Sequence, residues 1–211
     1  MQEVIASVIL LISSLASALW LLHYNKQAQE EHHFRIRVFA LSSLFISGYA
    51  LSHLFLRDPN SHTSTLLQMT ENLTLYVSLP FIATVFIAMS KGWHWSMAGW
   101  GRWLLGLIAF FELTRRTDFG ASYSYTLSLL VIAALLLSSI ANQSNMTRLL
   151  LLAGTVMTAI GSLVFSPIPL LMDEGNTALF MLTMALSIPL LMTSLHFRVQ
   201  EAGGSPPASR Q

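Results

Sequence analysis

Five polar residues stand out in a strongly apolar sequence, because their side chains can donate, accept or exchange protons. They lie within or at the ends of long hydrophobic segments: Tyr49, His53, Glu71, Asn72 and Glu112. A carboxylate one or two turns below a membrane surface costs about 1–3 kcal/mol, so such groups usually face the interior of a helix bundle. We therefore expect these residues to form one outward-facing polar site that binds a ligand.

Spacing and depth support this grouping. Glu71 belongs to a stripe that recurs at helical intervals, and His53 lies at a similar depth on the preceding segment, which runs in the opposite direction. A hydrogen bond or ion pair between His53 and Glu71 is geometrically easy, and a fourth segment brings Glu112 to the same level. The stripe contains Gln68, Glu71, Thr74, Leu75 and Ser78, with Asn72 at its edge.

Other chemistries remain open for the same residues. One histidine with two carboxylates can bind zinc or iron, so Glu71 and His53 would also suit a membrane-embedded, metal-dependent hydrolase acting on lipids. A second alternative is a small transporter that uses Glu71 as a proton-coupled carboxylate. A haem between His23 and His196 is a minor alternative. Because no His-x-x-x-His pair occurs in the hydrophobic segments, we predict no metal and no cofactor.

The elements that position these residues are seven hydrophobic segments. A membrane-spanning helix needs about 20 mostly apolar residues, and helices or closed barrels alone satisfy the backbone in lipid. We predict an all-α membrane protein, a seven-transmembrane-helix bundle formed by residues 1–200 and followed by a disordered cytoplasmic tail at 201–211. The spans are Val4–His23, Ile36–Leu56, Leu66–Ser90, Ser96–Leu113, Ala121–Ala141, Thr147–Leu171 and Thr177–Phe197.

Small residues and prolines predict how these helices pack. Gly154, Thr158 and Ser162 lie four residues apart on the sixth span, a pattern that permits close approach of a neighbouring helix. Ser13 and Ser17 have the same spacing on the first span. Pro80 and Pro189 lie inside spans, where each removes a backbone hydrogen bond and favours a kink.

Composition excludes several classes of protein. Hydrophobic residues make up 54% of the chain and charged residues 10%, against about 25% charged in soluble domains. Because cysteine is absent, disulfides, thiolate metal sites and cysteine nucleophiles are excluded. The sequence also lacks a P-loop, a dinucleotide-binding glycine motif and any basic run typical of nucleic-acid binding.

The distribution of basic residues predicts the orientation. Cytoplasmic loops carry the excess of lysine and arginine, and an outside N-terminus with a cytoplasmic C-terminus leaves only Arg57, Arg115 and Arg116 on the outer side. Four tryptophans near the inner loop between the third and fourth spans are typical of a membrane interface. The inner side then carries Lys26, Arg35, Arg37, Lys91, Arg102, Arg148, Arg198 and Arg210.

Together these features favour an integral protein of the bacterial inner (cytoplasmic) membrane with an outward-facing polar recess. We expect it to bind a lipid, a small ligand or a partner protein, as an accessory protein and not as an enzyme. The expected partners are membrane lipids and another integral membrane protein, with no nucleic acid.

Overall fold

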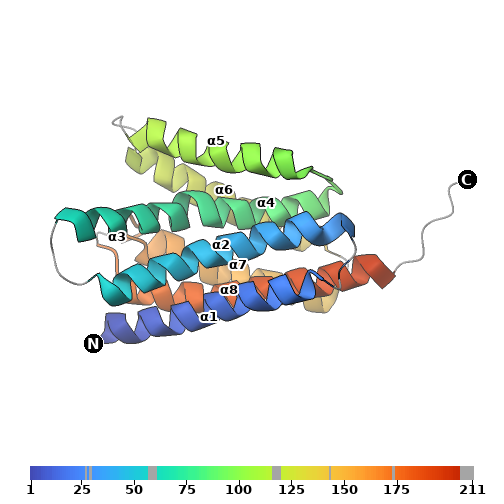
Figure 1. The fold of residues 1–211 in the computed structure, drawn as a ribbon, viewed down its shortest axis with the longest axis horizontal. Helices are drawn as coiled ribbons and strands as arrows, with labels where there is room; N and C mark the ends of the chain where they lie inside the picture. The colour runs from blue at the N-terminus through green and yellow to red at the C-terminus, as the bar shows by residue number, and fades with distance from the viewer. Residues whose placement is uncertain are drawn as a thin grey trace, which may run out of the picture.

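The computed structural model describes residues 1–26, 28, 30–56, 61–115, 120–142, 144–172 and 174–204, and this part of the chain is helical without any strand. The helices run along the long axis of the molecule, and each rod runs opposite to the one before it (Figure 1). Two rods contain a π-helical stretch, labelled η. The elements are α1 (Gln2–Tyr24), α2 (Glu30–Phe55), α3 (Ser61–Leu73) continuing through η1 (Thr74–Ser78) into α4 (Leu79–Ser90), α5 (Met97–Arg115), α6 (Gly120–Ile140), α7 (Asn145–Ile160) continuing into η2 (Gly161–Phe165), and α8 (Thr177–Gly204).

Within the described residues, six helices are long and apolar enough to cross a membrane. This identifies the chain as a helical membrane protein. The fourth predicted span is also helical, as α5, but it falls outside this set and carries Arg102, Glu112 and Arg115. It lies at the edge of the bundle, where it contacts η1 and α6 (Figure 1).

The bundle is built around α1, α2 and α8. Helix α1 packs against both α2 and α8, α7 packs against α8, and α6 contacts α4 and α7. Large aliphatic side chains such as Leu137 and Leu149 point outward, whereas small hydroxyl side chains such as Ser42 and Ser194 are buried. Apolar surfaces outside and small polar residues between helices are typical of a protein that lipid surrounds.

Close packing of α7 on α8 confirms the prediction from the small-residue stripe. A Cβ atom at Gly154 would lie 2.7 Å from Leu191 Cδ2 and 3.3 Å from the Leu191 backbone nitrogen, so a side chain there would require α8 atoms to shift. The hydroxyl of Ser187 reaches the Gly154 carbonyl at 3.1 Å and lies 2.6 Å from the Thr158 hydroxyl. These interhelical hydrogen bonds form because the missing side chain lets the two backbones approach.

The π-helical stretch η1 ends at Ser78, two residues before Pro80. A proline has no N–H and its ring clashes with the carbonyl four residues earlier. The helix forms a wider, π-helical turn instead: the backbone N–H of Leu79 donates to the carbonyl of Thr74, five residues back. π-Helical turns frequently lie at functional sites, and this one begins two residues after Asn72.

Pro189 leaves one carbonyl of α8 without its helical hydrogen-bond donor, and α1 supplies another donor. Because Pro189 lacks an N–H, the Ala185 carbonyl has no helical donor at that position. The hydroxyl of Ser13 on α1 donates to this carbonyl at 2.5 Å. A serine on the first helix thus compensates for a proline on the last one, which helps to fix α1 against α8.

Ser13→Ala is therefore expected to lower the free energy of unfolding by about 1 kcal/mol, because the Ala185 carbonyl loses its donor. Thermal unfolding in detergent measures the effect. Ser17→Ala is the matched control, since the Ser17 hydroxyl donates within its own helix, to the Ser13 carbonyl. Equal stability of the two variants would contradict the proposed role of Ser13.

Several helix boundaries differ from the prediction. The sixth span was predicted to reach Leu171, but η2 ends at Phe165 and Ser166 is extended, with φ −60° and ψ 160°. The cause is Pro167, because a residue before proline avoids the α conformation. Helix α8 continues to Gly204, past the predicted start of the tail; residues 205–211 lie outside the described residues, as do Arg57 and Arg116.

Candidate functional site

A recess of about 150 Å³ lies between α3 and α5, in the half of the bundle where α3 begins. Two of the predicted site residues line it, Asn72 from α3 and Glu112 from α5, and Gln68 lies one turn before Asn72. The remaining walls are mostly apolar: Leu73, Val77, Ile108 and Phe111. The recess therefore combines a carboxylate and two amides with a hydrophobic wall.

An aromatic stack anchors α5 beside this recess. Tyr76 of η1 stacks on Phe111 of α5 with ring centroids 4.2 Å apart, and on Tyr123 of α6 at 5.7 Å. Its hydroxyl lies 2.5 Å from the hydroxyl of Ser124. This fixed stack holds the α5 wall of the recess in position. Sequence reasoning did not include Tyr76 in the site, although its place in the polar third of the span was a signal.

Tyr49 and His53 form a second polar group on α2. They lie one turn apart, with ring centroids at 4.7 Å and the rings nearly perpendicular, and Tyr49 also contacts Phe180 of α8 at 6.0 Å. In the described part of the chain, the Tyr49 hydroxyl and His53 Nε2 are both buried without a hydrogen-bond partner. Buried polar atoms of this kind are rare, and they often mark a site that another molecule completes.

Glu71 lies between these two groups. It is half-buried on α3, one residue before Asn72, and it is close enough to Tyr49 and Tyr76 to interact electrostatically with both. Among the described residues no hydrogen bond or ion pair joins Glu71 to His53. Glu71 thus lies near the tyrosines and is not among the residues that line the recess with Asn72 and Glu112.

The structure adds an acidic residue that sequence reasoning did not place in the site. The carboxylate of Glu3, in the first turn of α1, interacts electrostatically with Tyr49 and His53. Its location at the expected outer end of the first span was the available signal. The proximity of Glu3 to Tyr49 and His53 depends on how α1 packs against α2, which the sequence does not specify.

The lining of the recess has the chemistry to bind a ligand. A carboxylate and amide groups beside an apolar wall can hold a ligand that has N–H or O–H donors and a hydrophobic part. No group of three or more His, Asp or Glu side chains within the described residues is placed to hold a metal ion. The five predicted residues therefore do not form one site. Asn72 and Glu112 line the recess, whereas Tyr49, His53 and Glu71 do not.

Comparison with protein-family models, with curated proteins and with solved structures finds no match to this chain.

Proposed function

We propose that this protein crosses a bacterial cytoplasmic membrane seven times, with its N-terminus outside, and binds the polar part of an amphiphile in the recess between α3 and α5. The observation that carries the proposal is the lining of this recess. Asn72 and Glu112 supply hydrogen-bond acceptors beside an apolar wall, and the recess lies in the half of the bundle expected to face outward.

The chemistry of the lining favours a ligand with N–H or O–H donors. A carboxylate accepts hydrogen bonds from an ammonium or hydroxyl group, and charge-assisted bonds of this kind are about twice as strong as neutral ones. Such a group occurs on lipid headgroups and on side chains of a partner's membrane helix. Three of the predicted residues lie outside the recess, on the other side of α3: Tyr49, His53 and Glu71.

Phosphatidylethanolamine and phosphatidylcholine form a suitable pair of probes, because only the first has N–H donors. We expect the wild-type protein in detergent to retain phosphatidylethanolamine in preference, measured by native mass spectrometry. Glu112→Gln is expected to reduce this preference about tenfold, because a hydrogen bond to a charged group contributes about 1.5–3 kcal/mol. Asn72→Leu should reduce it as well.

Glu71→Gln is the matched control, because it removes a carboxylate from α3 that does not line the recess. It is expected to leave the preference for phosphatidylethanolamine close to that of the wild type. Equal retention of the two lipids by the wild-type protein, or the same loss from Glu71→Gln as from Glu112→Gln, would contradict the proposed site.

Transport through the bundle is a second candidate with one supporting observation. Glu71 lies three residues before the π-helical stretch η1, which is followed by Pro80, and broken helices that line a binding site are common in transporters. Proton uptake into sealed vesicles that contain the protein tests this candidate. A flux that Glu71→Gln abolishes would support transport, and a flux equal to that of empty vesicles would contradict it.

A further inference from the structure

A second hollow lies at the opposite end of the bundle, where α4 leads into α5. An apolar groove of about 190 Å³ runs between α2, α4 and α5 and shares no lining residue with the recess described above. Its walls include Phe34, Val38, Leu41, Phe81 and Leu104. The groove is open because α5 packs loosely: a Cβ added at Gly101, which lines it, would meet no atom within 4 Å.

One end of the groove carries positive charge. Arg37 lines the groove itself, and a neighbouring hollow of about 400 Å³, which shares Phe34 and Trp100 with it, is lined by Arg35 and Glu30. Arg102 lines the next hollow. Among the described side chains that line these three hollows, three guanidinium groups stand against one carboxylate, so an anionic group is favoured there.

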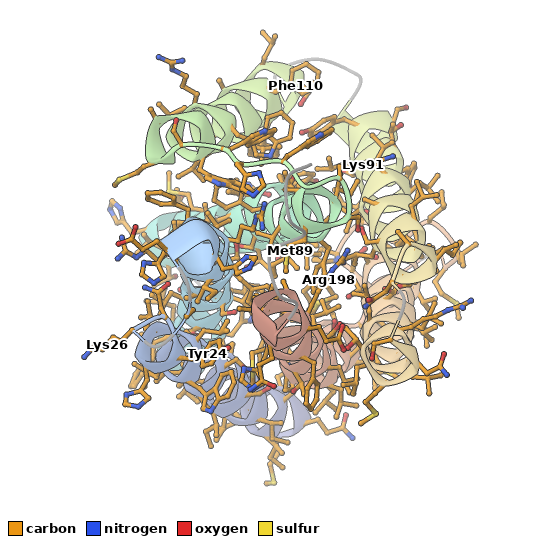
Figure 2. The ribbon with its side chains drawn as sticks, turned by 90° about the vertical axis from the view of Figure 1, so that its right-hand side faces the viewer. Tyr24, Lys26, Met89, Lys91, Phe110 and Arg198 are labelled. Atoms are coloured by element: carbon orange, nitrogen blue, oxygen red, sulfur yellow. The ribbon has the colours of Figure 1, made fainter. Side chains whose placement is uncertain are left out.

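Arg35 is held in position and not free to leave this end of the bundle. Its side chain is 5% exposed, and its guanidinium donates to the Trp93 carbonyl at 2.6 Å and lies 3.1 Å from His32 Nδ1. A second guanidinium, that of Arg198 on α8, lies close enough to interact electrostatically with Arg35. Figure 2 shows Arg198 in the middle of this end of the bundle, where its guanidinium donates to the Ser90 hydroxyl at 2.9 Å, whereas Lys26 extends outward from the edge.

A cluster of tryptophans indicates how deep in the membrane the groove lies. Trp95 lies 6.0 Å from Trp93 and 5.0 Å from Trp100 between ring centroids, and the Trp103 Nε1 donates to Thr84 at 3.1 Å. Indoles gather where hydrocarbon meets the headgroups. The arginines around the groove therefore lie at headgroup level, and its apolar walls extend toward the acyl chains.

We propose that this groove binds an anionic phospholipid of the adjacent leaflet, with an acyl chain between α2, α4 and α5 and the phosphate beside Arg37 and Arg35. Guanidinium groups match phosphate oxygens in geometry and charge, and basic pockets between membrane helices bind anionic headgroups. A free anion would contact only the charged end of the groove, and a neutral lipid would contact only its apolar walls. An anionic lipid uses both.

Phosphatidylglycerol with brominated acyl chains tests the proposal, because bromine quenches the fluorescence of nearby tryptophans and four of the five tryptophans lie in this cluster. The full-length protein in detergent is titrated with this lipid, and brominated phosphatidylcholine gives the background from lipid that binds unspecifically. We expect saturable quenching by phosphatidylglycerol at about tenfold lower concentration than by phosphatidylcholine.

Gly101→Leu fills the groove and is expected to weaken saturable quenching by about tenfold, without loss of fold because the added side chain enters open space. Gly106→Leu is the matched control on the same helix, where an added Cβ also meets nothing within 4 Å.

Two further variants test the charged end of the groove and its independence. Arg37→Gln should raise the phosphatidylglycerol concentration needed for quenching to that needed for phosphatidylcholine. Glu112→Gln should leave quenching unchanged, which separates this site from the recess. Wild-type quenching in both Gly101→Leu and Arg37→Gln would overturn the proposal.

Discussion

Gly154→Leu is expected to lower the free energy of unfolding by about 2 kcal/mol, because α7 and α8 meet without space for a side chain at this position. A Cβ alone would lie 2.7 Å from Leu191 Cδ2 and 3.3 Å from the Leu191 backbone nitrogen. The helices must separate, which also lengthens the bond from Ser187 to the Gly154 carbonyl. Leucine favours a helix over glycine by only about 1 kcal/mol, so the net effect is destabilising.

The thermal midpoint in detergent measures this effect, and Gly106→Leu is its control. Both variants introduce the same side chain into a helix, but the added atoms at Gly106 meet open space. We expect Gly106→Leu to unfold at or above the wild-type temperature. A Gly154→Leu variant as stable as Gly106→Leu would show that α7 does not pack on α8 as closely as described.

Tyr49 is expected to respond in opposite ways to two substitutions. Its side chain is fully buried, with 0% exposure, so Tyr49→Ala leaves a cavity and should lower the free energy of unfolding by roughly 3 kcal/mol, the low end for deleting an aromatic ring, since lipid already surrounds the bundle. Tyr49→Phe removes only a hydroxyl that has no partner in the described structure. It should therefore leave the stability unchanged or raise it.

Thermal unfolding of both variants, purified with and without endogenous lipid, separates packing from binding. If the Tyr49 hydroxyl contacts a bound molecule, Tyr49→Phe should lower the thermal midpoint only of protein that retains its lipid. A large destabilisation by Tyr49→Phe after delipidation would mean that the hydroxyl has a partner within the protein. That result would contradict the described surroundings of Tyr49.

The sequence predicts most of the fold because each span has to satisfy its own backbone in lipid. Hydrophobic length therefore locates the helices, and the α7–α8 contact follows from the stripe at Gly154, Thr158 and Ser162. Boundaries are less predictable where charged residues extend a helix beyond the membrane, as in α2, which begins at Glu30 and not at the predicted Ile36. Pro189 indicates that the Ala185 carbonyl needs a donor, but not that Ser13 supplies it.

The candidate site is harder to predict, because it depends on how each helix is rotated about its own axis. Tyr49 and His53 lie one turn apart on the same helix, so their proximity follows from spacing alone. Glu71 and Asn72 are adjacent in sequence and point apart, so only one of them can line a recess beside α5. Which one does so depends on the packing of Tyr76 between Phe111 and Tyr123, three residues from different helices.

The seven-span topology is tested most directly by labelling single cysteines, since the natural chain contains none. Cysteine is placed at four exposed positions near helix ends, Lys26, Lys91, Ser122 and Glu174, and a membrane-impermeant maleimide is added to intact spheroplasts. We predict labelling at Ser122 and Glu174 in intact spheroplasts, and at Lys26 and Lys91 only after the membrane is opened. Labelling of Lys91 and Ser122 from the same side would show that α5 does not cross the membrane, and would contradict the outward-facing recess.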